Sequence, residues 1–142
     1  MIGPIGKLRN GKFWNWYTFL QNFMTENELK FRTRLFAVAV LNFIDQLPNR
    51  RSANIIGNQL GRSGSSVAAN YRAACRGRSH AEFVAKIGTV EEEADESVFW
   101  PDIIPDTKNG TKDAVQPLLK EARELTAIFT AASKTAKRNR NK

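Results

Sequence analysis

The sequence contains very few of the residues that most often carry catalysis, metal binding or covalent cross-links. Its 142 residues include one cysteine, Cys75, and one histidine, His80. A single cysteine excludes a disulfide within the chain. One cysteine and one histidine also cannot supply the ligands of an ordinary Cys/His zinc site. We therefore expect no metal, no other cofactor and a cytoplasmic protein. A Ser-His-Asp or Cys-His pair would have to use His80, at a predicted helix start, so we expect no enzymatic activity.

Long apolar runs are also missing. No stretch is long and apolar enough to span a membrane. The aromatic segment "GKFWNWYTFLQNFM" is interrupted by polar residues and lacks a small-residue cleavage site, so it is a poor signal peptide. It could form an interfacial helix, or it could be upstream sequence, because a second methionine, Met24, opens "MTENE". We treat residues 1–24 as an appendage outside the core.

Acidic residues are in short supply relative to basic ones. The chain has 22 Lys and Arg against 14 Asp and Glu, a net charge of +8 and a pI of about 10.0. Such a balance favours a polyanionic partner, either nucleic acid or an anionic membrane surface. Hydrophobic residues make up 42%, so a chain of this length can form one domain with its own core.

Apolar residues recur at alternating spacings of four and three in four segments, which is typical of packed helices. The first begins at a capping box of Thr25 and Glu28 and ends before Pro48. The second covers residues 52–76, and Gly77 follows it as a helix-ending residue.

The third segment begins at a second capping box, Ser79 with Glu82, and Pro101 should end or kink it just after Trp100. The fourth begins between Asp113 and Pro117. Because the links are short, neighbouring helices should be antiparallel. The pattern predicts an all-α, up-down-up-down four-helix bundle over residues 25–137, followed by a frayed basic tail at 138–142.

The second segment contains the unusual stretch "GRSGSSVAAN". It lacks the Gly-Lys-Ser/Thr ending of a phosphate-binding loop, and no strand precedes it. On the helical frame, Ser63 and Asn70 fall on the seam that faces the other helices. A buried Asn70 would fix the register or the choice of partner helix. A catalytic role is disfavoured because no other candidate catalytic residue accompanies it. We expect Ser63 and Ser66 to pack and to bond the preceding turn.

Arginines of this segment point outward on the same frame. The third segment is acidic, and the antiparallel hairpin should bring Arg62 near Glu93. Three others near the turn are freer and either contact phosphates or form a solvated face: Arg72, Arg76 and Arg78. Antiparallel topology places the basic C-terminal residues at the same end of the bundle: Lys134, Lys137, Arg138 and Arg140.

Three aromatic residues lie off the seams or at their ends: Tyr71, Phe99 and Trp100. A monomer would expose them, so we expect them to make subunit contacts.

The stretch "GNQLGRSGSSVAANYRAACRGRSHAEFVAKIGTVEEEADESVFW" resembles the four-helix-bundle family of proteins encoded in intervening sequences of bacterial 23S ribosomal RNA genes. The resemblance covers about residues 28–137. Ala73 departs from it where the family often has glutamate, and Pro101 where the family usually has leucine. The matching positions are Gln59, Leu60, Arg62, Ser63, Ser66, Ala69, Asn70, Tyr71, Ala74, Phe83, Lys86, Glu93, Ala94, Glu96 and Trp100.

The resemblance implies a left-handed bundle that assembles as a ring-shaped homopentamer without enzymatic activity. Similar proteins include the accessory subunit of diversity-generating retroelements, a basic pentamer that binds a reverse transcriptase and nucleic acid. We therefore expect an oligomeric protein that binds nucleic acid, RNA first, and is associated with an intervening or mobile element. The alternative is a structural adaptor for a protein partner such as a reverse transcriptase. Residues expected to serve packing or assembly are Arg62, Ser63, Ser66, Asn70, Tyr71, Glu93, Glu96 and Trp100.

Overall fold

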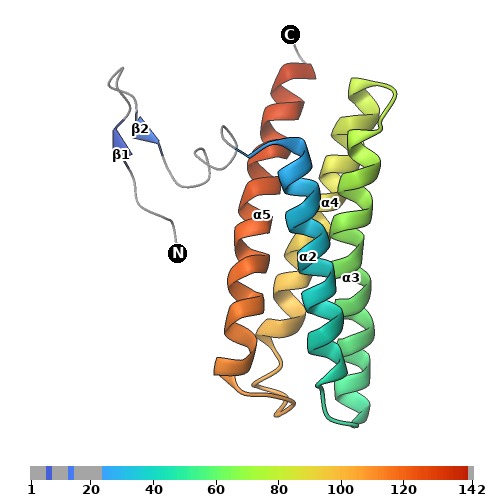
Figure 1. Cartoon of the computed structure of the whole chain (residues 1–142), viewed down its shortest axis with the longest axis vertical. Helices are drawn as coiled ribbons and strands as arrows, with labels where there is room; N and C mark the ends of the chain where they lie inside the picture. The colour runs from blue at the N-terminus through green and yellow to red at the C-terminus, as the bar shows by residue number, and fades with distance from the viewer. Residues whose placement is uncertain (1–5, 8–12, 15–23, 141–142) are drawn as a thin grey trace.

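The computed structural model describes residues 6–7, 13–14 and 24–140. Two short strands, β1 (Gly6–Lys7) and β2 (Phe13–Trp14), pair antiparallel. Most of the segment expected to be an appendage, residues 1–24, lies outside the described residues. The four helices are α2 (Glu26–Asp45), α3 (Arg51–Cys75), α4 (His80–Asp102) and α5 (Lys112–Arg140) (Figure 1).

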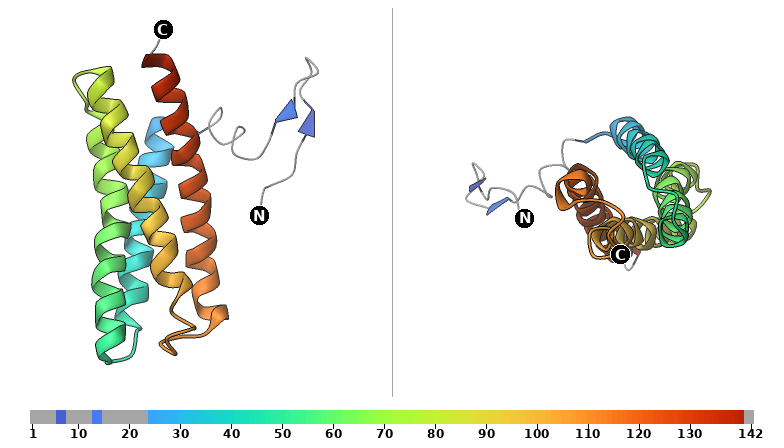
Figure 2. Two further views of the ribbon diagram at one scale, coloured as in Figure 1. Left: turned by 180° about the vertical axis from the view of Figure 1, so that it is seen from behind. Right: turned by 90° about the horizontal axis from the view of Figure 1, so that it is seen from below.

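The four helices form the predicted up-down-up-down bundle. In Figure 1, α2 and α4 descend and α3 and α5 ascend, as the colour gradient shows. Helix α3 packs between α2 and α4, and α4 packs on α5, whereas α2 meets α5 far less. The end-on view in Figure 2 shows the helices arranged in sequence order around one axis. Helix α2 is nearest the viewer in Figure 1, where it descends and α3 lies to its right. If the bundle is turned upside down so that α2 ascends, α3 lies to the left of α2, which defines a left-handed bundle.

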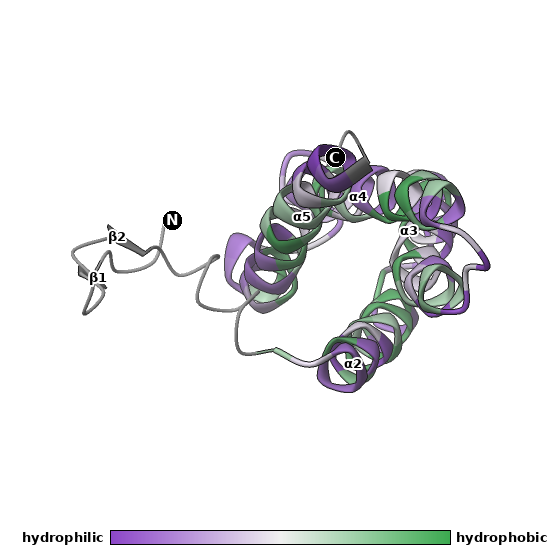
Figure 3. Ribbon diagram, turned by 90° about the horizontal axis from the view of Figure 1, so that it is seen from above, coloured by the Kyte–Doolittle hydropathy of each residue, from purple (hydrophilic) through white to green (hydrophobic). Residues whose placement is uncertain are grey.

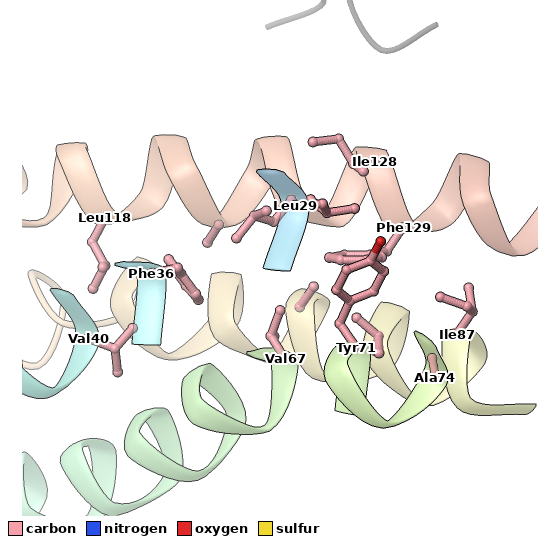
Figure 4. Close-up of a cluster of buried hydrophobic side chains, with 14 of the residues drawn as sticks. Leu29, Phe36, Val40, Val67, Tyr71, Ala74, Ile87, Leu118, Ile128 and Phe129 are labelled. Atoms are coloured by element: carbon pink, nitrogen blue, oxygen red, sulfur yellow. The ribbon is translucent and has the colours of Figure 1, made fainter. Parts of the chain in front are cut away.

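The core runs along the bundle axis and contains side chains from all four helices (Figure 4). Viewed end-on, hydrophobic and hydrophilic residues alternate along each helix (Figure 3). Side chains at the centre of the core include Phe36, Val40, Leu60, Val67, Val90, Leu125 and Phe129. This burial is the main source of helix stability, because helices of this kind are marginal alone in water.

Local signals set the starts of α2 and α4, as predicted. The Thr25 hydroxyl accepts a hydrogen bond from the Glu28 backbone N–H at 3.1 Å, and the Glu28 carboxylate accepts one from the Thr25 N–H at 3.0 Å. The Ser79 hydroxyl accepts from the Glu82 N–H at 3.1 Å, but the Glu82 carboxylate accepts from the Arg78 N–H instead. The start of α4 therefore has only half of a capping box, because the Glu82 carboxylate bonds the residue before the N-cap Ser79.

Helix α4 continues past its proline, contrary to the expected stop at Trp100. It includes Pro101, which is buried, and ends at Asp102. The following Ile104 is fully buried in a second small cluster with Ile56, Val115 and Leu119. Pro101 therefore lies in the last turn of α4, and Ile104, two residues past the helix end, is anchored in the second cluster.

The connection after α4 is held by side chains that the sequence pattern did not single out. The Arg50 guanidinium donates to the Thr107 and Lys108 carbonyls and, at 2.8 Å, to Asn109 Oδ1. The Asn109 amide donates to Ser52 Oγ at 3.0 Å. These bonds join the α4–α5 connection to the start of α3.

Helix α5 continues to Arg140, past the expected end of the bundle at residue 137. Ser133 and Ala136 are buried, and His80 Nε2 lies 2.9 Å from the Ala136 carbonyl oxygen. The last turns of α5 therefore pack against the start of α4, and residues 138–140 are helical where a frayed tail was expected.

Candidate nucleic-acid interface

A groove lies on the outer surface between α2 and α3. In the half of α3 that is farther from the α3–α4 turn, Gly57, Gly61 and Gly64 allow α3 to pack closely on α2. A Cβ at Gly64 would lie 2.8 Å from a Val40 methyl carbon. Toward the α3–α4 turn, small side chains on α3 leave a volume of about 820 Å³. We call this the basic groove; its lining residues are Lys30, Phe31, Arg34, Ser65, Ala68, Ala69, Arg72 and Arg76.

The charge of the basic groove is carried mainly by three arginines. Arg34, Arg72 and Arg76 are exposed, and none of them pairs with a carboxylate among the described residues. Lys30 Nζ lies 2.9 Å from the Glu26 carboxylate, and this hydrogen bond and charge lower the pKa of Glu26. Cations from two helices therefore face one concave surface, which attracts anions.

The other predicted cations lie at the same end of the bundle, as the antiparallel topology requires. Arg78 is exposed in the α3–α4 turn, and the last turns of α5 reach this end in Figure 1. The described α5 cations there are exposed: Lys134, Lys137 and Arg138. Arg140 closes the helix, and its side chain lies outside the described part. None of these residues lines the basic groove.

Sequence reasoning missed the α2 side of this groove, namely Lys30, Phe31 and Arg34. The Lys30–Arg34 pair has the i, i+4 spacing that places two cations on one helix face. That spacing could have marked a basic strip on α2. It could not have shown that the strip lies opposite Arg72 and Arg76.

Arg62 lies near Glu93, as the hairpin geometry predicted, but the two form no ion pair in the described structure. Burial and the nearby Glu96 raise the pKa of Glu93, and the Arg62 charge opposes that rise. The Ser63 hydroxyl is buried and donates to the Leu60 carbonyl oxygen at 3.3 Å. The Ser66 carbonyl accepts a bond from the Asn70 amide at 2.9 Å. Ser63 therefore lies in the core and bonds the preceding turn, as expected, whereas the bond at Ser66 is made by its backbone carbonyl.

The predicted seam position of Asn70 is wrong. Asn70 is half-buried and bonds its own helix, whereas Tyr71 occupies the core with 7% exposure, its ring 5.3 Å from that of Phe129. Both positions satisfy the three-four spacing, and the aromatic side chain buries more apolar surface. Burial raises the pKa of Tyr71 and that of the neighbouring Cys75 thiol.

The aromatic residues expected at subunit contacts also divide differently. Tyr71 is unavailable because it is buried. Trp100 is half-buried and donates from Nε1 to the Glu96 carboxylate at 3.1 Å. Phe99 packs edge-on against Trp100 and remains 52% exposed. Of the three, Phe99 alone keeps the large exposure that was expected.

A row of exposed apolar side chains lies instead along α2. We call it the apolar face of α2: Phe31 (61% exposed), Leu35 (52%), Val38 (48%) and Leu41 (50%). Contiguous exposure of this kind is uncommon in soluble monomers and usually marks an interaction surface. This face is separate from the core-facing side of α2, which carries the buried residues Leu29, Phe36 and Val40.

The described side chains contain no group of three or more His, Cys, Asp or Glu residues placed to hold a metal ion. Among the described helices, none is long and apolar enough to cross a membrane.

Comparisons with known proteins agree with this architecture. A family model described as "23S rRNA-intervening sequence protein" matches residues 25–131. The chain is similar to a crystal structure from Bacteroides thetaiotaomicron, a protein of unknown function from the S23 ribosomal protein family. The two share 27% identity with a TM-score of 0.71, and the match covers 78% of this chain and 99% of the other. No curated protein matches the chain.

Proposed function

Because this chain belongs to the family of 23S rRNA-intervening sequence proteins, we propose that it is a non-enzymatic, homo-oligomeric protein that binds nucleic acid, with RNA as the expected ligand. We further propose an association with an intervening or mobile element. The observation that carries the binding proposal is the basic groove, where Arg34, Arg72 and Arg76 face solvent without a carboxylate partner in the described chain.

Guanidinium groups suit this task. Each is planar, permanently charged and able to donate two parallel hydrogen bonds to a phosphate. A phosphate backbone that crosses the groove would meet cations from both helices. Such contacts release condensed counterions, so binding should weaken steeply as salt rises.

The test is RNA affinity as a function of salt concentration for two triple variants of the full chain. R34Q/R72Q/R76Q removes three charges from the groove. R51Q/K112Q/K120Q is the matched control; it removes three exposed charges toward the other end of the bundle. Loss of about three phosphate contacts should make the log-log salt slope shallower by about 2 for a single strand. Equal weakening by both variants, or no RNA binding at low salt, contradicts the proposal.

The homo-oligomer is supported by Leu35, Val38 and Leu41 of the apolar face of α2, which give one copy a surface to bury against another. The resemblance to this family implies a ring of five subunits. Such a ring would repeat the basic groove around its circumference and bind one polyanion at several sites, which raises avidity.

The same apolar face favours a second candidate function, a structural adaptor for a protein such as a reverse transcriptase. Size-exclusion chromatography of the chain mixed with a purified reverse transcriptase distinguishes the two. A complex that forms without nucleic acid and resists high salt would favour the adaptor.

A further inference from the structure

Phe31 has a position that general phosphate binding does not explain. Its side chain is 61% exposed, yet it lines the basic groove beside Arg34 and opposite the α3 arginines. We propose that the basic groove binds single-stranded nucleic acid, with an unpaired base stacked on the Phe31 ring and the adjoining phosphates held by Arg34, Arg72 and Arg76. This inference rests on the proposed function and specifies the form of its ligand.

The combination of an aromatic ring with cations along one groove is what single-strand binding requires. Every base has a flat aromatic face that can stack on a protein ring, and arginines track the phosphates on either side. In a duplex the bases already stack on one another and cannot reach the ring. Phe31 would therefore contribute to single-strand binding and little to duplex binding.

The floor of the groove suits a stacked nucleotide and has little means to read its identity. Ala68 and Ala69 have no polar side-chain atoms, and the Ser65 hydroxyl donates to the Gly61 carbonyl oxygen at 2.6 Å. The volume of about 820 Å³ lies within the range of ligand pockets, roughly 300–1,000 Å³. We therefore expect weak sequence preference, because stacking tolerates every base.

Lys30 has a smaller role in this arrangement. Its ammonium group already pairs with Glu26 at 2.9 Å, so the carboxylate offsets its charge. The three arginines are unpaired in the described structure and are left to hold phosphates.

The experiment compares labelled oligonucleotides of about 12 nucleotides, within the usual site size for such grooves. The ligands are single-stranded RNA, the same sequence as single-stranded DNA, the RNA duplex, and vesicles that contain phosphatidylserine. The protein is the full chain as wild type, F31L and F31W. The matched control is F99L, which changes another half-exposed phenylalanine, on α4. Leu35, Val38 and Leu41 are unchanged in these variants, so self-association through α2 should persist.

Wild type should bind the single strands more tightly than the duplex. F31L should weaken single-strand binding about 5- to 100-fold with an unchanged salt slope, F31W should restore it, and F99L should behave as wild type. Either single strand, RNA or DNA, satisfies the inference, and the stronger arm identifies the ligand.

Four results would overturn the inference. Equal binding of single strand and duplex, or full affinity in F31L, removes the stacking role while nucleic-acid binding stands. Binding to vesicles with none to any oligonucleotide shows a membrane surface. Absence of all binding removes the proposed function as well.

Discussion

Glycines of this bundle differ in what surrounds them, and so in what their substitution should do. Gly64 on α3 faces Val40 of α2, and an added Cβ would lie 2.8 Å from a methyl carbon. Gly88 on α4 has nothing within 4 Å of the same added atom. Both lie inside helices, where glycine is less favourable than alanine by about 1 kcal/mol.

We expect Gly88→Ala to raise the free energy of unfolding by about 0.5–1 kcal/mol, because the helix gains propensity without a clash. Gly64→Ala should lower it by about 1–3 kcal/mol, because α2 must shift away from the added methyl group. Urea denaturation followed by circular dichroism measures both. A shift of the same sign in the two variants would contradict the assigned role of Gly64.

Among the helices, α2 has the weakest attachment to the rest of the bundle. It packs along α3 but meets α5 sparsely. A forked ion pair joins it to α5: Arg32 Nε lies 2.6 Å from Glu121 Oε1, and Nη2 lies 2.8 Å from Glu124 Oε2. The three side chains are partly buried, so the interaction is stronger than a fully solvated pair.

We predict that Arg32→Gln lowers the free energy of unfolding by about 1–2 kcal/mol and speeds hydrogen exchange in α2 before the other helices. The control is Arg123→Gln, since the Arg123–Asp102 pair is about half exposed at 3.4 Å. That change should cost no more than about 0.5 kcal/mol. If both variants cost the same, the α2–α5 ion pair does not hold the helix.

For the whole molecule, the basic groove and the apolar face of α2 share only Phe31. The basic groove occupies the end with the α3–α4 turn, whereas most of the apolar face of α2 continues toward the other end. Exposed acids, Glu92 and Asp95, lie on α4. The proposed self-association through Leu35, Val38 and Leu41 of α2 would therefore leave the groove arginines open to the proposed polyanion.

We predict that L35S/V38S/L41S lowers the oligomer mass toward that of one chain, because it removes half-exposed apolar groups from the subunit contact. Phe31 is kept so that the groove stays intact. Ile55→Ser changes a similarly exposed apolar residue on α3 and should keep the assembly. Multi-angle light scattering gives the masses, and circular dichroism should show unchanged helix content. A monomeric wild type across a wide concentration range would refute self-association.

Much of the fold could be predicted because its signals are local. The capping residues Thr25 and Ser79 act within one turn of their helices. The three-four spacing of apolar residues identified four helices, and short links made them antiparallel. The end predicted for the third helix, just after Trp100, lies two residues before the observed end at Asp102.

What the sequence by itself determined is therefore the number, order and direction of the helices, the family and the basic end of the bundle. Only the tertiary structure decided that Tyr71 and not Asn70 enters the core, because both fit the spacing and Phe129 is the contact that selects the ring. The tertiary structure also decided that the cations of the basic groove lie on one surface. These cations lie about forty residues apart in the chain, and only antiparallel packing of α2 on α3 brings them to one surface.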